Sequence, residues 1–292
     1  MIPALEIRGL HKTYKNFALQ NVSFALEPGT IMGLVGPNGA GKTTIIKLIL
    51  GMIRPSEGAI RVFGLDVPRH EAEIKRRIGF VQETPTLVED ALLRDIKAAV
   101  APFYPKWDDL RFSSLAADFG LMLNKKFKTL SHGQKMKFQL ALALCHDADL
   151  LILDEPTSGL DPVFRRELLE RLSDVIQDER KSVLFSTHIT SDLESTADII
   201  TFISRGKLVF SLPKDGIRDV WAVVKGGTEL ENGDRAGLFR SLRRNPYGVE
   251  ALTSDIPAVR AAFPAGIVID RASIEDIMVF MDSGESHVDI HP

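Results

Sequence analysis

The sequence predicts an α/β fold organised around a mostly parallel sheet, and two observations carry this prediction. Residues 31–50 give an apolar strand, a glycine-rich loop and a helix in direct succession. Apolar strands recur at 150–153, 183–185 and 199–203, with an amphipathic helix between the first two. Strands that alternate with helices favour a parallel sheet, whose ligand lies at the carboxyl ends of its strands.

The glycine-rich loop is the first candidate site. It matches the phosphate-binding pattern G-x-x-x-x-G-K-[ST] in the strand-to-helix context that the pattern requires. Glycines let backbone N–H groups converge on phosphate oxygens, and the following helix offers its positive N-terminal end. We expect Lys42 to reach the β- and γ-phosphates and Thr43 to bind Mg²⁺. The predicted binding residues are Gly36, Pro37, Asn38, Gly39, Ala40, Gly41, Lys42, Thr43 and Thr44.

Composition excludes several classes of protein. With 292 residues, 45% of them hydrophobic and 26% charged, the chain has the composition of a soluble globular protein. A net charge of -3 gives no general affinity for nucleic acid or anionic lipid. The single cysteine, Cys145, excludes a disulfide framework and a thiolate zinc site. Because we find no membrane-spanning run and no secretory signal, we expect a cytosolic protein whose membrane span, if it needs one, belongs to another chain.

The remaining elements of the first two hundred residues follow from local patterns. Strands are predicted at 5–10, 19–26, 58–64 and 78–81. The last of these leads into Gln82, and residues 87–124 then change to a helical periodicity broken by prolines. We interpret this stretch as a helical insertion.

Two carboxylates follow the strand at 150–153. Asp154 stands at the strand end, where we expect it to hold Mg²⁺ opposite Thr43. Glu155 lies one residue further, so its side chain diverges and can orient or deprotonate an attacking water. A lone Asp-Glu pair is more often a solvated strand end, but the phosphate loop earlier in the chain favours the catalytic interpretation.

The motif Leu-Ser-His-Gly-Gln at 130–134 stands upstream of Leu-Asp-Glu-Pro-Thr-Ser-Gly-Leu-Asp-Pro at 153–162. In this order the motifs resemble the nucleotide-binding subunit of an ATP-binding cassette (ABC) transporter. The resemblance implies a P-loop NTPase core with an antiparallel β edge, and ATP and Mg²⁺ as cofactors. We accordingly expect a nucleotide-binding domain at 1–212, with a helical subdomain at about 86–145, and a small α+β accessory domain at 213–292.

The resemblance assigns roles to three further positions. Tyr14 matches the aromatic residue that stacks on adenine, with a core tyrosine as the alternative. Gln82 matches the Q-loop glutamine, which in the family touches Mg²⁺ and the attacking water and links the site to the membrane subunit. His188 matches the switch histidine that contacts the γ-phosphate. The expected catalytic residues are therefore Glu155, His188 and Gln82.

The signature segment explains why one chain is not expected to suffice. Ser131 and Gly133 precede a helix predicted from Gln134 to Cys145, so a hydroxyl, backbone N–H groups and a helix N-terminus form a second anion site. In the family this site closes on the γ-phosphate held by a second subunit, and the Asp161 segment crosses the seam.

His132 departs from the commonest signature, Leu-Ser-Gly-Gly-Gln, at a glycine position. Its side chain is expected to crowd the phosphate or to add a donor, with activity retained.

The resemblance implies an ATP-hydrolysing motor that dimerises around two ATP molecules, as a homodimer, and drives export through a separate transmembrane permease subunit. It would lie peripherally on the cytoplasmic face of the membrane, with the insertion as its docking surface and no nucleic acid as partner. The cluster Phe-Tyr-Pro-Lys-Trp-Asp at 103–108 resembles a feature of ABC-2-type exporters, whose cargo would be a peptide, an antibiotic or a lipid; packing within the insertion is the alternative interpretation. An importer subunit and a non-transport ABC ATPase are the alternative functions.

The last eighty residues are less informative. Strands are predicted at 221–224, 249–252 and 267–269, and a closing helix at 273–281. We hypothesise that this region serves dimerisation or regulation. His287 and His291 are expected to belong to a solvated tail rather than to a metal site.

Overall fold

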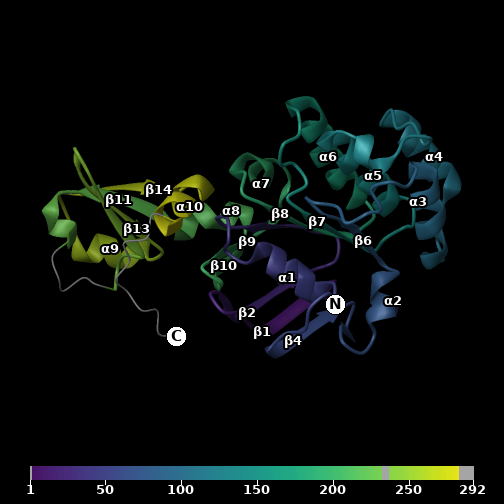
Figure 1. Cartoon of the computed structure of the whole chain (residues 1–292). Coiled ribbons are helices and arrows are strands. Elements are labelled where there is room, and N and C mark those ends of the chain that lie inside the picture. Colours follow the sequence, from purple (N-terminus) through teal and green to yellow (C-terminus); the bar gives the residue numbers. More distant parts are fainter. Residues whose placement is uncertain (1, 232–236, 283–292) are drawn as a thin grey trace. The chain divides into compact units, whose positions relative to one another are not determined.

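The computed structural model describes residues 2–231 and 237–282 (Figure 1). The chain divides into two compact units, Met1–Ser211 and Leu212–Pro292. His287 and His291 lie outside the described residues. Within the described ranges, none of the helices has both the length and the apolar character needed to cross a membrane.

A ten-stranded mixed sheet organises the first unit. Its strands are β1 (Leu5–Thr13), β2 (Ala18–Leu26), β3 (Ile31–Val35), β4 (Glu57–Val62), β5 (Leu65–Asp66), β6 (Ile78–Val81), β7 (Leu150–Asp154), β8 (Ser182–Thr187), β9 (Ile199–Ser204) and β10 (Lys207–Pro213). They lie side by side in the order β5-β4-β1-β2-β10-β9-β3-β8-β7-β6.

The pairing separates a parallel centre from an antiparallel edge. Strand β3 pairs in parallel with β8 and β9, and β7 pairs in parallel with β6 and β8. Strand β1 pairs antiparallel with β2 and β4. Strands β3 and β7 are buried along their whole length, as expected where both faces of a parallel sheet are covered. The predicted α/β fold is confirmed.

Helices cover this sheet and connect its strands. They are α1 (Lys42–Ile49), α2 (Glu71–Lys75), α3 (Leu93–Val100), α4 (Asp109–Asp118), α5 (His132–Leu144), α6 (Pro162–Val175) and α7 (Thr190–Thr196), with 3-10 turns η1 (Ala101–Phe103) and η2 (Phe127–Thr129). Helix α1 packs against both β4 and β7, between the antiparallel and parallel parts of the sheet (Figure 1). Its apolar side chains, such as Ile45 and Leu48, join the main core. This packing fixes the glycine-rich loop relative to the carboxyl end of β7.

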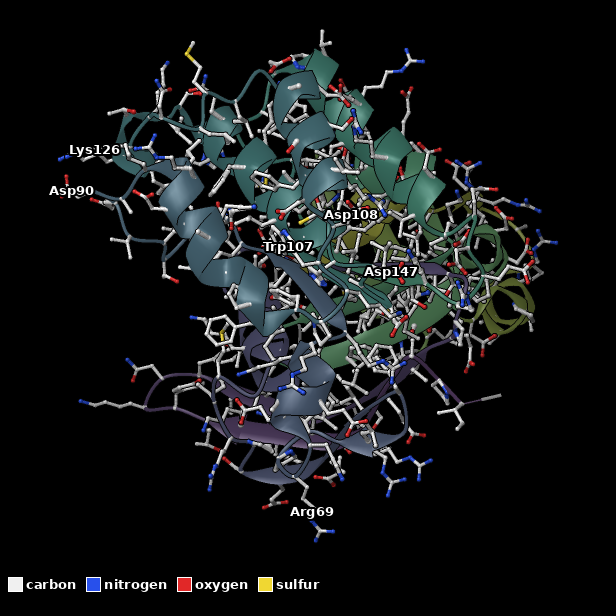
Figure 2. The ribbon with its side chains drawn as sticks, turned by 90° about the vertical axis from the view of Figure 1, so that its right-hand side faces the viewer. Arg69, Asp90, Trp107, Asp108, Lys126 and Asp147 are labelled. Carbon is white, nitrogen blue, oxygen red and sulfur yellow. The ribbon has the colours of Figure 1, made fainter. Side chains whose placement is uncertain are left out.

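Helices α3 and α4 lie within the segment interpreted as a helical insertion, and α5 packs against α4 and β6. Figure 2 shows Trp107 and Asp108 on this insertion and Asp90 and Lys126 at its outer edge. The ammonium of Lys126 lies 3.4 Å from a carboxylate oxygen of Asp90.

The aromatic cluster at 103–108 divides between surface and core. Phe103 is 72% exposed. The ring of Tyr104 stacks on that of His146 with centroids 3.8 Å apart, and the ring of Trp107 lies 5.8 Å from that of Phe112. For Tyr104 and Trp107 these contacts support the packing interpretation.

The second unit contains a four-stranded sheet in the order β12-β13-β11-β14. Its elements are α8 (Lys214–Val220), β11 (Ala222–Gly226), η3 (Thr228–Glu231), β12 (Ser241–Asn245), β13 (Gly248–Thr253), α9 (Ile256–Ala262), β14 (Val268–Arg271) and α10 (Ile274–Asp282). Strand β11 pairs antiparallel with β13 and β14, and β12 pairs antiparallel with β13. A separate apolar core forms where Val224 and Ala251 pack with Val259 and Phe263.

Candidate functional site

The glycine-rich loop between β3 and α1 has a backbone shape that side chains would obstruct. Gly39 and Gly41 have φ values of 79° and 112°, in the region that favours glycine. A Cβ atom on Gly36 would lie 2.1 Å from the backbone oxygen of Ile203, and one on Gly41 would lie 2.7 Å from a methyl of Leu19. Around Gly39, by contrast, there is open space. The loop is therefore packed tightly on one side and open on the other, as a phosphate cradle requires.

Helix α1 begins at this loop without a side-chain cap, because its N-cap residue is Gly41. The first N–H groups of a helix have no intrahelical acceptor, and the helix dipole makes this end positive. Asn38 and Thr43 are exposed beside it. The helix start is thus suited to bind an anion such as phosphate.

Three predicted residues from three separate motifs meet beside the loop. The Nζ atom of Lys42 lies 3.1 Å from Oε1 of Glu155 and donates to the backbone oxygen of Gly36 at 2.7 Å. The Nδ1 atom of His188 lies 2.8 Å from Oε2 of Glu155. Lys42 and Glu155 are only 6% and 7% exposed, so each buried charge is compensated by the other.

Ser186, on β8, holds both predicted acids. Its hydroxyl donates to Oδ1 of Asp154 at 2.6 Å and accepts the backbone N–H of Glu155 at 2.9 Å. Glu155 has a φ of 48°, which is unusual for a residue other than glycine. The bond from Ser186 fixes this sharp turn, which directs the Glu155 side chain towards Lys42. Sequence reasoning missed Ser186 as a site residue; the parallel pairing of β7 with β8 is what brings it beside Asp154.

The side chain of Gln82 has its hydrogen-bond partner in its own loop. Its side-chain amide donates to the hydroxyl of Thr86 at 3.1 Å rather than to a member of the Lys42 cluster. Its main chain is held by Gln139 of α5, whose Oε1 accepts the Gln82 N–H at 3.2 Å and whose Nε2 donates to the Gln82 oxygen at 3.0 Å. Gln139 was not predicted as a site residue.

Tyr14 lies at the surface and is not a core residue. Its side chain is 45% exposed, and the Lys12 ammonium lies 5.5 Å from the centre of its ring. Phe17 lies between it and the glycine-rich loop: the two ring centroids are 6.5 Å apart, and Cζ of Phe17 is 2.8 Å from where a Cβ on Gly41 would be. An exposed aromatic ring beside the loop is suited to stack on a base.

The signature segment caps its own helix. The hydroxyl of Ser131 accepts the N–H of Gln134 at 3.3 Å, and Oε1 of Gln134 accepts the N–H of Ser131 at 3.2 Å. This reciprocal capping box starts α5 at His132, two residues earlier than predicted. Ser131 and His132 are exposed, and Gly133 is half-buried.

His132 is anchored to the segment that leads to Asp161. Its Nε2 lies 2.9 Å from the backbone oxygen of Ser158, and its ring is next to Gly159. Asp161 in turn caps α6, because its Oδ1 accepts the N–H of Phe164 at 3.0 Å. The signature segment and the segment after β7 are therefore linked within one chain.

Known proteins share these features. A protein-family model described as "ABC transporter" matches residues 19–158. The lantibiotic transport ATP-binding protein SrtF of Streptococcus pyogenes is 34% identical over 73% of this chain and 92% of its own length. The ABC transporter ATP-binding protein NatA of Bacillus subtilis is 31% identical over 66% of this chain and 80% of its own length. The bacitracin transport ATP-binding protein BcrA of Bacillus licheniformis is 32% identical over 69% of this chain. The match spans 66% of BcrA, which is just under two thirds of its length.

Solved structures agree with the sequence comparisons. One structure of the ATP-binding subunit of an ABC transporter superimposes with a TM-score of 0.68 and is 30% identical, over 74% of this chain and 92% of that one. A dimeric ATP-binding cassette with ADP and Pi in a post-hydrolysis state shares the fold, with a TM-score of 0.64 and 22% identity over 72% of this chain and 98% of that one. The resemblance found in the motifs is confirmed, and the chain belongs to the ABC transporter family as an ATP-binding, ATP-hydrolysing subunit.

Proposed function

We propose that this ATPase binds ATP and Mg²⁺ beside the cluster of Lys42, Glu155 and His188, closes on a second copy of itself, and drives export through a separate transmembrane subunit. The observation that carries the proposal is the contact of the buried Glu155 carboxylate with both Lys42 and His188. Glu155 thus lies within hydrogen-bonding distance of a lysine suited to bind phosphate and of an imidazole suited to orient the carboxylate, which supports its role as general base.

The oxygen donors beside the loop fit a magnesium ion. Asp154 is a nearly buried carboxylate at the end of β7, and Thr43 presents a hydroxyl in the first turn of α1, which packs against β7. Carboxylate and hydroxyl oxygens are the ligands that Mg²⁺ prefers. When bound, the ion supplies charge neutralisation at the phosphates. Gln82 joins these ligands if its amide leaves Thr86.

ATP binding requires the residues of the cluster to exchange partners. Lys42 leaves Glu155 for the β- and γ-phosphates, which frees a carboxylate oxygen to accept a proton from water. His188, held by the other oxygen of Glu155, is then positioned to contact the γ-phosphate. Tyr14 stacks on the adenine.

The second copy completes the site. Ser131 and Gly133 stand at the start of α5, where backbone N–H groups and the helix dipole attract the γ-phosphate bound by the partner. Gln134 keeps this corner in shape through the capping box. Asp161 caps α6 at the segment proposed to cross the seam. The γ-phosphate of ATP then links the two copies, and hydrolysis breaks this link.

The named relatives support export. Two of them are a lantibiotic transport and a bacitracin transport ATP-binding protein, and another is a Nod factor export ATP-binding protein of Burkholderia orbicola that is 33% identical over 71% of this chain. These names favour an exporter over an importer. We propose a peptide, an antibiotic or a lipid as its cargo. We place the protein peripherally on the cytoplasmic face of the membrane, docked to its permease through the helical insertion.

Glu155→Gln tests the proposal. We expect ATP hydrolysis to fall by about 10²-fold or more, because the amide cannot accept the proton, while ATP-induced dimerisation measured by size-exclusion chromatography persists. Lys42→Ala should lose ATP affinity instead, because it removes the charge-assisted phosphate contact. Glu170→Gln, an exposed carboxylate of α6 that pairs with Arg166, is the matched control and should leave both properties unchanged. Full activity of Glu155→Gln would contradict the general-base role, and an ATP-loaded Glu155→Gln protein that stays monomeric would contradict the sandwich.

A further inference from the structure

Asp192 is a buried carboxylate with no assigned function. It lies in the first turn of α7, four residues after His188, and it is 1% exposed. A carboxylate buried to this degree is costly unless charged or hydrogen-bonding partners surround it.

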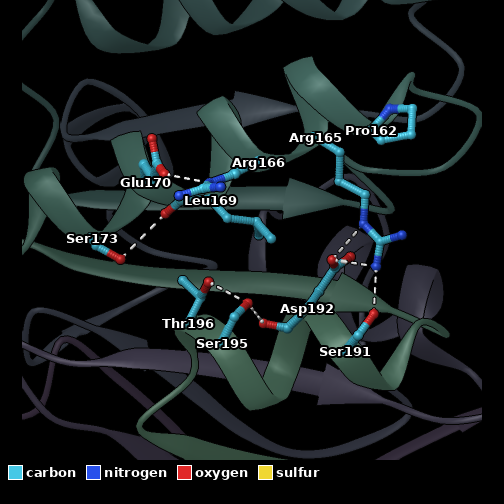
Figure 3. Close-up of a pocket in the computed structure, with 10 residues that line it drawn as sticks. All are labelled: Pro162, Arg165, Arg166, Leu169, Glu170, Ser173, Ser191, Asp192, Ser195 and Thr196. Atoms are coloured by element: carbon cyan, nitrogen blue, oxygen red, sulfur yellow. Dashed lines mark hydrogen bonds and ion pairs between the residues drawn. The ribbon is translucent and has the colours of Figure 1, made fainter.

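Two residues from one segment bind this carboxylate. Oδ1 accepts from the Nε and Nη2 atoms of Arg165, at 2.7 and 2.6 Å. Oδ2 accepts from the hydroxyl of Thr157 at 2.6 Å, and Thr157 is itself 1% exposed. Figure 3 shows Arg165 reaching from α6 to Asp192 and to the hydroxyl of Ser191, across a groove of about 370 Å³ between α6 and α7.

The segment held in this way contains Asp161. Thr157 stands two residues after Glu155, and Arg165 stands in the first turn of α6, where its N–H donates to the Asp161 oxygen at 3.0 Å. Both ends of the turn from Thr157 to Arg165 are thus fastened to one carboxylate. The Asp192 carboxylate therefore adds side-chain anchors to the few backbone bonds that this turn makes itself.

The same carboxylate is tied to the hydrolytic pair. Helix α7 begins directly after His188 and its N-cap Ile189, and His188 is hydrogen-bonded to Glu155. Besides the pairing of β7 with β8 and the Glu155–His188 contact, the segments that follow these two strands are therefore joined by the bond of Thr157 to Asp192. The Thr157–Asp192 bond is buried, and the partly exposed Arg165 adds a charge-assisted bond to the same carboxylate.

We propose that Asp192 is a positioning residue for ATP hydrolysis. It fixes the position of the Asp161 segment relative to Glu155 and His188. Contact of a second copy with the Asp161 segment is then transmitted through Thr157 and Asp192 to the base. The proposal rests on the proposed function, because it takes the roles of Glu155 and Asp161 from it.

Thr157→Val tests the link with the least change in shape, because valine replaces the hydroxyl by a methyl. We expect kcat for ATP to fall about tenfold, the effect of about one lost positioning hydrogen bond, with the KM for ATP within about twofold of the wild-type value. Thr157→Ser keeps the donor and should recover most of the rate. Thr201→Val, in β9, is the matched control, since Thr201 is also a fully buried threonine with a hydroxyl bond but lies outside this network.

The outcomes separate a positioning role from a purely structural one. Loss of stability without a change in kcat, or a loss of rate that Thr157→Ser does not recover, would overturn the inference. Should Thr157→Val fail to fold, Arg165→Gln decides, because Arg165 is partly exposed: a wild-type kcat there would also overturn it. Glu155→Gln is measured in parallel to separate failure of this inference from failure of the proposed function. If Thr157→Val has the wild-type rate while Glu155→Gln is inactive, only the positioning role of Asp192 is rejected.

Discussion

Replacing His146 by phenylalanine should remove a pH dependence of folding stability from this protein. His146 is 2% exposed, and among the described residues neither of its ring nitrogens has a hydrogen-bond partner. Burial lowers the pKa of His146 from 6.5 to about 4, with the nearby Lys181 acting in the same direction and Asp147 opposing it. The ring is therefore neutral in the folded protein at pH 5, where a histidine of the unfolded chain is protonated.

The sign and size of the effect follow from this difference. Between the two pKa values the unfolded chain binds more protons than the folded one, so the free energy of unfolding falls as the pH drops from about 6.5 to about 4. The stability from this group is fully present above pH 6.5. The loss reaches at most about 3 kcal/mol, and between pH 7.5 and pH 5 it is about 2 kcal/mol.

Urea unfolding at pH 7.5 and pH 5 measures the effect. The fluorescence of Trp107 reports on this region, because its ring lies 6.4 Å from that of Tyr104, which stacks on His146. A Trp221→Phe background removes the second tryptophan of the chain. We expect the loss of stability on acidification to be about 2 kcal/mol smaller in His146→Phe than in the wild-type protein.

Carboxylates that titrate in the same range contribute equally to both proteins and cancel in the comparison. His70→Phe, which replaces an exposed histidine, is the control and should keep the wild-type pH dependence. An equal loss of stability on acidification in His146→Phe and wild type would refute the reasoning.

Three further changes test other contacts. Gln139→Leu should deprive the backbone N–H and oxygen of Gln82 of their partner. We expect the free energy of unfolding to fall by about 1–2 kcal/mol and amide hydrogen exchange at Gln82 to become faster. Unchanged exchange at Gln82 would contradict the role of Gln139 in holding this main chain. His132→Gly removes the contact with Ser158 and should leave the ATPase rate within about threefold of wild type, since one exposed hydrogen bond contributes little; a rate lowered by a hundredfold would make His132 essential. We also propose that the residues after Pro213 form a separate accessory domain. A chain ending at Pro213 should bind ATP with wild-type affinity in equilibrium titration, because the residues of the main core all precede that point. Loss of ATP binding would contradict the division into two domains.

The parts of the fold that the sequence predicted are those with strong local patterns. The phosphate loop is an example, because an apolar strand, glycines and a helix follow one another within twenty residues. Strand β12 was missed, since Ser-Leu-Arg-Arg-Asn reads as polar and lies exposed at the edge of its sheet. Helix α9 was missed because it is short and has proline in its first turn, where the residue is harmless in a helix but weakens a helical prediction.

For the site, the motifs predicted which residues carry the chemistry, and long-range contacts determine how those residues are held. Ser186 binds the N–H of Glu155 across 31 positions, and Gln139 binds the N–H of Gln82 across 57. Asp192 binds Thr157 across 35. A serine, a glutamine and an aspartate are common residues without a local pattern, so only the folded chain shows that each has a buried or half-buried partner. The same holds for the Gln82 side chain, whose bond to Thr86 no motif indicates.

Three of the residues proposed to hold nucleotide have partners within their own chain. Lys42 contacts Glu155, the hydroxyl of Ser131 accepts a bond from Gln134, and Asp161 caps its own helix. In the function proposed above, ATP and a second copy would replace these bonds, so that closure would be an exchange of partners. Such an exchange is balanced enough to be reversed when the γ-phosphate is lost, because a ligand shifts an equilibrium only by its differential affinity for the two states. For Lys42 this affinity difference is that between a phosphate and the Glu155 carboxylate, so we expect the contact that compensates the buried lysine to oppose the proposed closure.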